Sequence, residues 1–113
     1  MEIAIVRGSP APWGIDGHLY INRERVCDTV EHPTKHLPSG EYQISLPFKE
    51  GPGLDSPFKH GDGAMGCTKG EIIVGKHLLP GVVTQSRATY QRLYERIRKA
   101  RRRGSPIRLK IVG

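Results

Sequence analysis

Only one segment of this chain, residues 86–103, has the length and periodicity of an ordinary helix. Its apolar side chains recur at intervals of three or four residues and share one face: Tyr90, Leu93, Tyr94, Ile97 and Ala100. Ser86 is the expected N-cap, and Gly104, followed by Pro106, is the expected end. A single helix with one modest apolar stripe is expected to lie on a sheet built by the rest of the chain.

The remaining segments indicate short strands separated by turns, since the 113 residues include 14 Gly and 9 Pro. The expected strands are residues 1–7, 17–21, 25–30, 41–46, 72–74 and 107–111. Residues 22–23 have the length of a tight hairpin turn, and residues 47–57 are expected to form a loop. We predict one α+β domain over residues 1–113. Its mainly antiparallel, curled sheet forms a partial barrel with one C-terminal amphipathic helix packed on it.

The glycine-rich segment 59–67 carries two groups that can do chemistry together. It places the imidazole of His60 seven residues before the thiol of Cys67. A thiol attacks carbonyl carbon as the thiolate, and a neighbouring imidazole can accept its proton. Glycines also let backbone N–H groups approach a developing oxyanion. The alternative is a glycine-rich turn with a buried structural cysteine and a surface histidine.

Two carboxylates are candidates to orient an imidazole. Asp62 is close to His60 in sequence, and Asp28 could reach a ring from a neighbouring strand. Both equally suit ordinary roles, Asp62 in its own turn and Asp28 on an exposed strand face. The other histidines lack metal-ligand spacing, so no metal site and no cofactor are predicted. A zinc site from His60, Cys67 and another histidine stays open, as does a bridge between Cys67 and Cys27.

The positive charge is concentrated in the predicted helix. Residues 87–103 hold eight basic side chains and one acidic one, Glu95, which together equal the net charge of +7 for the whole chain. The candidate anion-binding residues are Arg92, Arg96, Arg98, Lys99, Arg101, Arg102 and Arg103. Such a segment favours nucleic acid, an acidic wall polymer or lipid headgroups. A solvated helix face that keeps the protein in solution is the simpler explanation, because no aromatic residues interleave with the charges.

The order of the motifs resembles a phage and bacterial family known as Domain of Unknown Function 5675. The resemblance covers residues 15–111. The motifs that carry it are residues 17–21, 26–31 and 37–42, His60, Gly66-Cys67, residues 73–75, 86–88 and the closing strand. The family's His and Gly-Cys elements look like those of L,D-transpeptidases.

That resemblance implies that His60 is the base, that Cys67 is the nucleophile, and that Gly66 and the Cys67 amide bind the oxyanion. The implied activity is cysteine-dependent acyl transfer or hydrolysis on peptidoglycan stem peptides, in a phage- or prophage-associated protein. The basic helix would then hold the protein against an anionic wall. Two alternatives stay open: a small non-catalytic β interaction module, as a virion or accessory protein, and a nucleic-acid-binding domain that uses the basic C-terminal helix.

The chain shows no export signal and no segment able to span a bilayer. Residues 1–7 alternate and then meet Gly8-Ser9-Pro10, without the basic start and long apolar stretch of a signal peptide. No apolar run approaches the roughly 20 residues that a membrane helix needs. We therefore expect a protein that is cytoplasmic as synthesised, unless another factor delivers it to the cell wall or a virion.

Overall fold

One curled sheet and one long helix make up the fold. The computed structural model describes residues 1–44, 57–67 and 69–113. The strands are β1 (Glu2–Arg7), β2 (Ile15–Ile21), β3 (Glu24–Glu31), β4 (Gly40–Gln43), β5 (Phe58–Lys59), β6 (Ile72–Leu79), β7 (Val82–Thr84) and β8 (Arg108–Val112). The helix is α1 (Ser86–Arg102), and a short 3-10 helix, η1 (Ala64–Gly66), precedes β6. Residues 45–46 of one predicted strand and 47–56 of the predicted loop lie outside the described residues.

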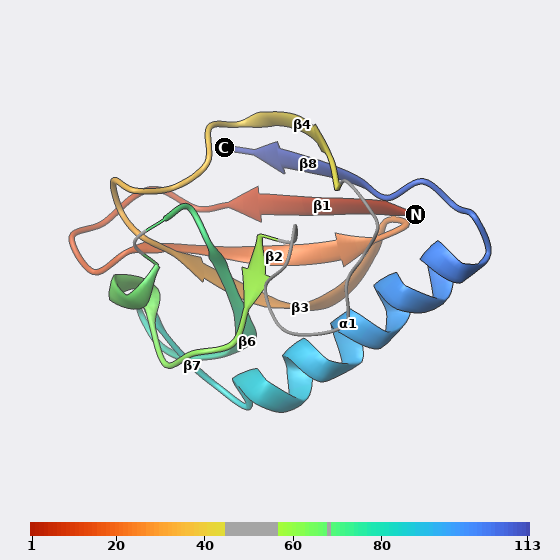
Figure 1. Cartoon of the computed structure of the whole chain (residues 1–113). Coiled ribbons are helices and arrows are strands. Elements are labelled where there is room, and N and C mark those ends of the chain that lie inside the picture. Colours follow the sequence, from red (N-terminus) through yellow and green to blue (C-terminus); the bar gives the residue numbers. More distant parts are fainter. Residues whose placement is uncertain (45–56, 68) are drawn as a thin grey trace.

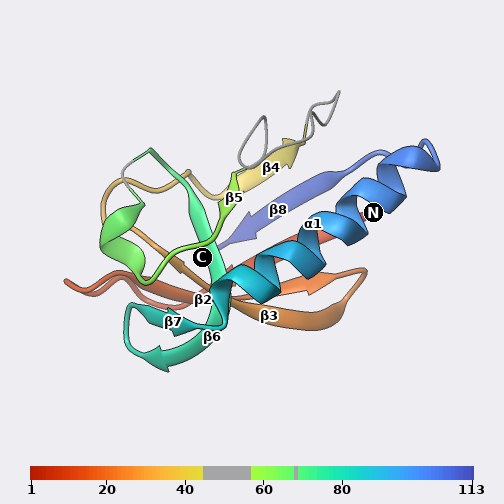
Figure 2. The ribbon, with the colours of Figure 1, turned by 60° about the horizontal axis from the view of Figure 1, so that its bottom comes forward.

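The strand order confirms the predicted α+β class. The sheet runs β4-β8-β1-β2-β3-β6-β5, and β7 pairs with the far end of β6. Most pairs are antiparallel, but β1 pairs with β8 in parallel, and so does β5 with β6. Figure 1 shows the terminal strands β1 and β8 side by side, with α1 providing the crossover to β8. The sheet curls into a half-barrel, and α1 crosses one of its faces (Figure 2).

The predicted hairpin between β2 and β3 is confirmed and contains a bulge. Asn22 and Arg23 both adopt positive φ, 50° and 72°, as a tight turn between twisted strands requires. The pairing shifts by one residue after Tyr20↔Arg25, so that Leu19 faces Cys27. Side chains alternate between the two faces of a strand, so one extra residue moves each later side chain of β3 to the opposite face from the one it would have without the bulge.

The start of α1 corrects one prediction. Gln85, with φ of 54°, occupies the N-cap, and Ser86 is the first helical residue. The Ser86 hydroxyl donates to the Val74 carbonyl at 2.5 Å and accepts the Gly61 N–H at 3.0 Å. Ser86 therefore ties the loop after β5 to β6 instead of capping its own helix. The helix ends as expected, with Gly104 at φ of 77°.

Most of the buried apolar residues in the described part of the chain form two clusters, on opposite faces of the sheet. The larger one packs α1, through Tyr90, Leu93 and Ile97, against β1, β2, β6 and β8. The smaller cluster consists of Val30, Ala64, Cys67, Ile73 and Val83. Strand β6 contributes to both, because its alternate residues point to opposite faces: Ile72 and Val74 join the larger cluster and Ile73 the smaller one.

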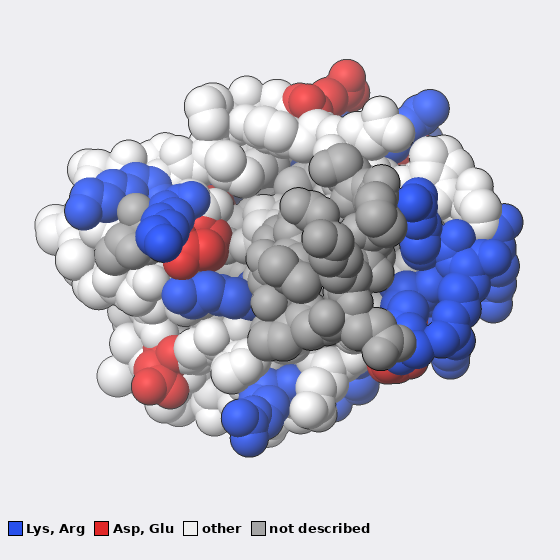
Figure 3. Space-filling view, viewed as in Figure 1, with Lys and Arg blue, Asp and Glu red and all other residues white. Residues whose placement is uncertain are grey.

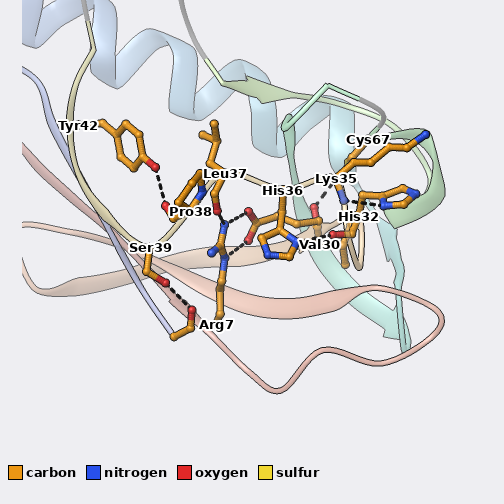
Figure 4. A network of polar contacts seen from close by, with 12 residues as sticks. Arg7, Val30, His32, Lys35, His36, Leu37, Pro38, Ser39, Tyr42 and Cys67 are labelled. Atoms are coloured by element: carbon orange, nitrogen blue, oxygen red, sulfur yellow. Dashed lines mark hydrogen bonds and ion pairs between the residues drawn. The ribbon is translucent and has the colours of Figure 1, made fainter.

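A buried ion pair joins the ends of β1 and β3. The Arg7 guanidinium donates to both carboxylate oxygens of Glu31, at 2.9 and 2.6 Å, and also to the Leu37 carbonyl at 2.5 Å. The two side chains are 2% and 0% exposed. Figure 4 shows Arg7 beneath Leu37 in this network. Arg7 thus links the end of β1 both to the end of β3 and to the segment that follows β3.

Candidate functional site

The structure separates His60 from Cys67. His60 is exposed, and its ring lies edge-on to Tyr90 of α1, with the ring centroids 5.6 Å apart. Tyr90 belongs to the larger cluster, whereas Cys67 belongs to the smaller cluster with Ile73. These clusters lie on opposite faces of β6, so the imidazole and the thiol do not share a cleft.

The Cys67 thiol is buried among apolar side chains. It is 0% exposed, and its sulfur lies 3.8 Å from the Val30 carbonyl, to which it donates (Figure 4). Burial raises the pKa of Cys67 to about 11, although the nearby Lys59 ammonium lowers it. Burial and the Asp28 charge also raise the pKa of Cys27, to about 12. Both residues are free thiols, and neither is activated as a nucleophile.

The two amides assigned to the oxyanion already have acceptors. The Gly66 N–H donates to Gly63 at 3.2 Å, and the Cys67 N–H donates to Ala64 at 3.0 Å, both within the turn of η1. The predicted oxyanion role of Gly66 is therefore not supported, because its donor points into the turn and not toward a substrate.

Lys59 contacts both sides of the segment that contains Cys67. Its ammonium donates to the Gly66 carbonyl at 3.2 Å and forms an ion pair with Glu71 at 3.1 Å. Partial burial tends to raise the pKa of Glu71, but the Lys59 ammonium and backbone donors outweigh it and lower that pKa. Lys59 therefore connects β5 to the backbone just before Cys67 and to the start of β6.

The two candidate orienting carboxylates do not reach His60. Asp62 is exposed; its backbone carbonyl accepts the Val83 N–H, and none of the contacts among the described residues joins its carboxylate to His60. Asp28 instead accepts a hydrogen bond from His18 and one from the backbone of His77. Asp28 does orient histidines, but they are different ones from the predicted base.

Thiol labelling checks this geometry directly. At pH 8 the folded protein is expected to react with a thiol reagent at least about a hundredfold more slowly than the unfolded chain, since a raised pKa leaves little thiolate. The rate should climb toward pH 11, the pKa of Cys67. A Cys27→Ser variant isolates the signal of Cys67. Rapid labelling of Cys67 in the folded protein near pH 7 would contradict its burial and favour the acyl-transfer prediction.

The predicted cationic face of α1 is present and solvent-exposed. Arg92, Arg96, Lys99 and Arg103 are all exposed, and their spacing of four, three and four residues aligns them; we call these four residues the basic stripe. At 1.5 Å per residue the basic stripe is about 16 Å long. Figure 3 shows a dense gathering of Lys and Arg over the end of α1 that leads to β8.

Two features refine the predicted set of anion-binding residues. Arg98 is half-buried and lies 3.5 Å from Glu95, so part of its charge is balanced within the helix. Arg101 and Arg102 are exposed in the last turn, where positive charge also stabilises the helix dipole.

An open depression of about 490 Å³ runs beside the basic stripe; its lining residues are Ala88, Gln91, Arg92, Glu95, Arg96 and Lys99.

Sequence reasoning missed one cluster of functional side chains. His18, Asp28 and His77 lie together on the sheet face opposite α1, with ligand atoms within 4.8 Å of one another. They come from β2, β3 and β6, where Asp28 pairs with His18 on one side and Gly75 on the other. The turn at residues 22–23 does predict that β2 and β3 pair, and therefore that His18 lies close to Asp28. Without the bulge, however, the pairing would place Cys27 and not Asp28 opposite His18.

Comparisons with protein-family models, with curated proteins and with solved structures found no match to this chain. The resemblance to Domain of Unknown Function 5675 and the acyl-transfer activity that it implies therefore stay predictions. No helix in the described part of the chain is long and apolar enough to cross a bilayer.

Proposed function

We propose that this protein is a non-catalytic module that binds the phosphodiester backbone of nucleic acid through an exposed, basic face of α1. The observation that carries this proposal is the basic stripe: four exposed cations aligned along one helix face, in a segment where Glu95 is the single acid. The burial of the Cys67 thiol and the position of His60 beside Tyr90 also favour this proposal over cysteine-dependent acyl transfer.

The geometry favours recognition of charge over recognition of sequence. The side chains along the depression beside the basic stripe include no aromatic ring, so bases have no stacking platform there. Arginine and lysine contact phosphate oxygens without reading base identity. We therefore expect binding to duplex DNA that depends weakly on sequence and strongly on salt.

The salt dependence of binding tests the proposal. Four phosphate contacts correspond to a slope of about −4 for log K against log salt on duplex DNA. Fluorescence anisotropy with two unrelated duplexes of equal length, measured from about 50 to 200 mM salt, is expected to give this slope with similar affinities. An absence of binding at the lowest salt would overturn the proposal, as would affinity that does not change with salt.

The same experiment separates nucleic acid from an anionic wall polymer. A poly(glycerol phosphate) chain, offered at the same phosphate concentration, presents a similar charge without the fixed geometry of a duplex. Weaker competition by this polymer than by unlabelled duplex is the expected result. Tighter binding of the wall polymer would overturn the assignment to nucleic acid and favour the cell wall as the site of action.

A further inference from the structure

Three side chains on the face opposite α1 have the composition of an open metal centre. We propose that His18, Asp28 and His77 bind one divalent transition-metal ion, with zinc as the best-matched ion. Two imidazoles and one carboxylate are ligands that zinc accepts, and a set of three leaves a position for water or another small ligand. The proposal is independent of nucleic-acid binding, because α1 lies on the other face of the sheet.

The backbone holds the three ligands in place before any ion arrives. Each ligand comes from a different strand, and the three strands are neighbours in the sheet. The Asp28 carboxylate is fixed by the His77 backbone N–H at 2.9 Å. A site on paired strands is more rigid than one on loops, which lowers the ordering cost of binding.

His77 is oriented as metal-binding histidines usually are. Its Nε2 lies 3.0 Å from the Thr29 carbonyl, which accepts only, so the proton of the neutral ring sits on Nε2. The lone pair of Nδ1 is then free, and Nδ1 lies 3.8 Å from Asp28 Oδ2. A backbone carbonyl that fixes the second ring nitrogen is the usual outer contact of a histidine ligand.

The distances match a small ion after minor adjustment. Ligand atoms about 2.1 Å from a tetrahedral zinc lie about 3.4 Å apart. His77 Nδ1 lies 3.8 Å from Asp28 Oδ2, and His18 Nδ1 lies 2.9 Å from the other carboxylate oxygen, Oδ1. One ligand atom from each residue lies within 4.8 Å of the other two, so the three side chains move closer together around a bound ion. To bind the ion through Nδ1, His18 takes its other neutral tautomer, with the proton on Nε2.

The cluster is charged and accessible. The Asp28 carboxylate accepts hydrogen bonds from the His77 backbone, Arg25 and His18, which favour its ionised form. The side chains of His18 and His77 are 38% and 27% exposed, which gives an ion an entry path. Arg25 contacts Asp28 Oδ1 at 2.9 Å, and as its side chain is 57% exposed it can turn aside for the ion.

Calorimetric titration of the tag-free, chelator-treated protein with zinc chloride tests the proposal. One ion per chain is expected for the wild type. His18→Gln and His77→Gln should each bind at least about tenfold more weakly. The matched control is His36→Gln, which removes a half-buried histidine outside the cluster and should bind as the wild type does. Melting curves in chelator verify that each variant is folded, and His18, the more exposed of the two histidines, keeps one variant informative if His77→Gln unfolds.

X-ray absorption at the zinc edge identifies the ligands. A first shell of nitrogen and oxygen, with two imidazoles and no sulfur, is the expected result. Sulfur in that shell would assign the ion to a cysteine and overturn the proposal. The absence of stoichiometric binding, or unchanged affinity in both His18→Gln and His77→Gln, would overturn it as well.

Discussion

Glu31→Gln is expected to lower the free energy of unfolding by about 3–5 kcal/mol, because it leaves a buried guanidinium without its counter-charge. Arg7 donates to both oxygens of Glu31, and neither side chain reaches solvent. The amide of glutamine keeps one acceptor but turns an N–H₂ group toward the Arg7 donors. Domains of this size are stable by about 5–15 kcal/mol, so the loss is a large fraction of the total. Urea denaturation measures it.

Two variants separate the ion pair from general effects of mutation. Glu41→Gln removes an exposed carboxylate of β4 and should change stability by less than about 0.5 kcal/mol. The double variant Arg7→Met/Glu31→Leu replaces the pair with apolar side chains and should recover much of the loss. A Glu31→Gln protein within about 1 kcal/mol of the wild type would show that the pair contributes little to the fold.

Local patterns predicted the helix and the hairpin, but not how distant segments combine. The spacing of Leu93, Ile97 and Ala100 identifies α1, because helix periodicity depends only on residues near in sequence. The parallel pairing of β1 with β8 instead brings residues 2–6 beside residues 108–112, at opposite ends of the chain. No local pattern of residues 1–7 or 107–111 contains that information.

The candidate site shows the same limit more sharply. A cysteine after a glycine-rich turn suits both a nucleophile and a core residue, and burial decides between them only when the chain is folded. Asp28 lies opposite His18 only because β3 contains one extra residue at a bulge. No glycine, proline or turn motif in the sequence predicts that bulge. The basic stripe was predictable, because its charged residues belong to one continuous segment whose helical periodicity can be recognised from the same residues.

Charge reversal on the basic stripe is the second large expected effect. Arg92→Glu/Arg96→Glu/Lys99→Glu removes three phosphate contacts and adds three repulsive charges. Duplex affinity at low salt should fall roughly a hundredfold, or about 2.8 kcal/mol. The salt slope should flatten from about −4 to about −1, since each lost phosphate contact lowers it by about one.

The matched control carries the same change in net charge at a different place. Lys35→Glu/Lys76→Glu/Lys110→Glu replaces three exposed lysines outside α1. This control distinguishes a localised binding face from attraction by overall charge, which both triple variants reduce equally. Thermal melts of both proteins verify that each remains folded.

Anisotropy titration of one labelled duplex with these two triple variants is the most direct test of a nucleic-acid-binding face on α1. The expected result is a roughly hundredfold loss of affinity for the α1 variant and a change of less than about fivefold for the control. Equal losses in the two variants, or undiminished binding by the α1 variant, would contradict the account.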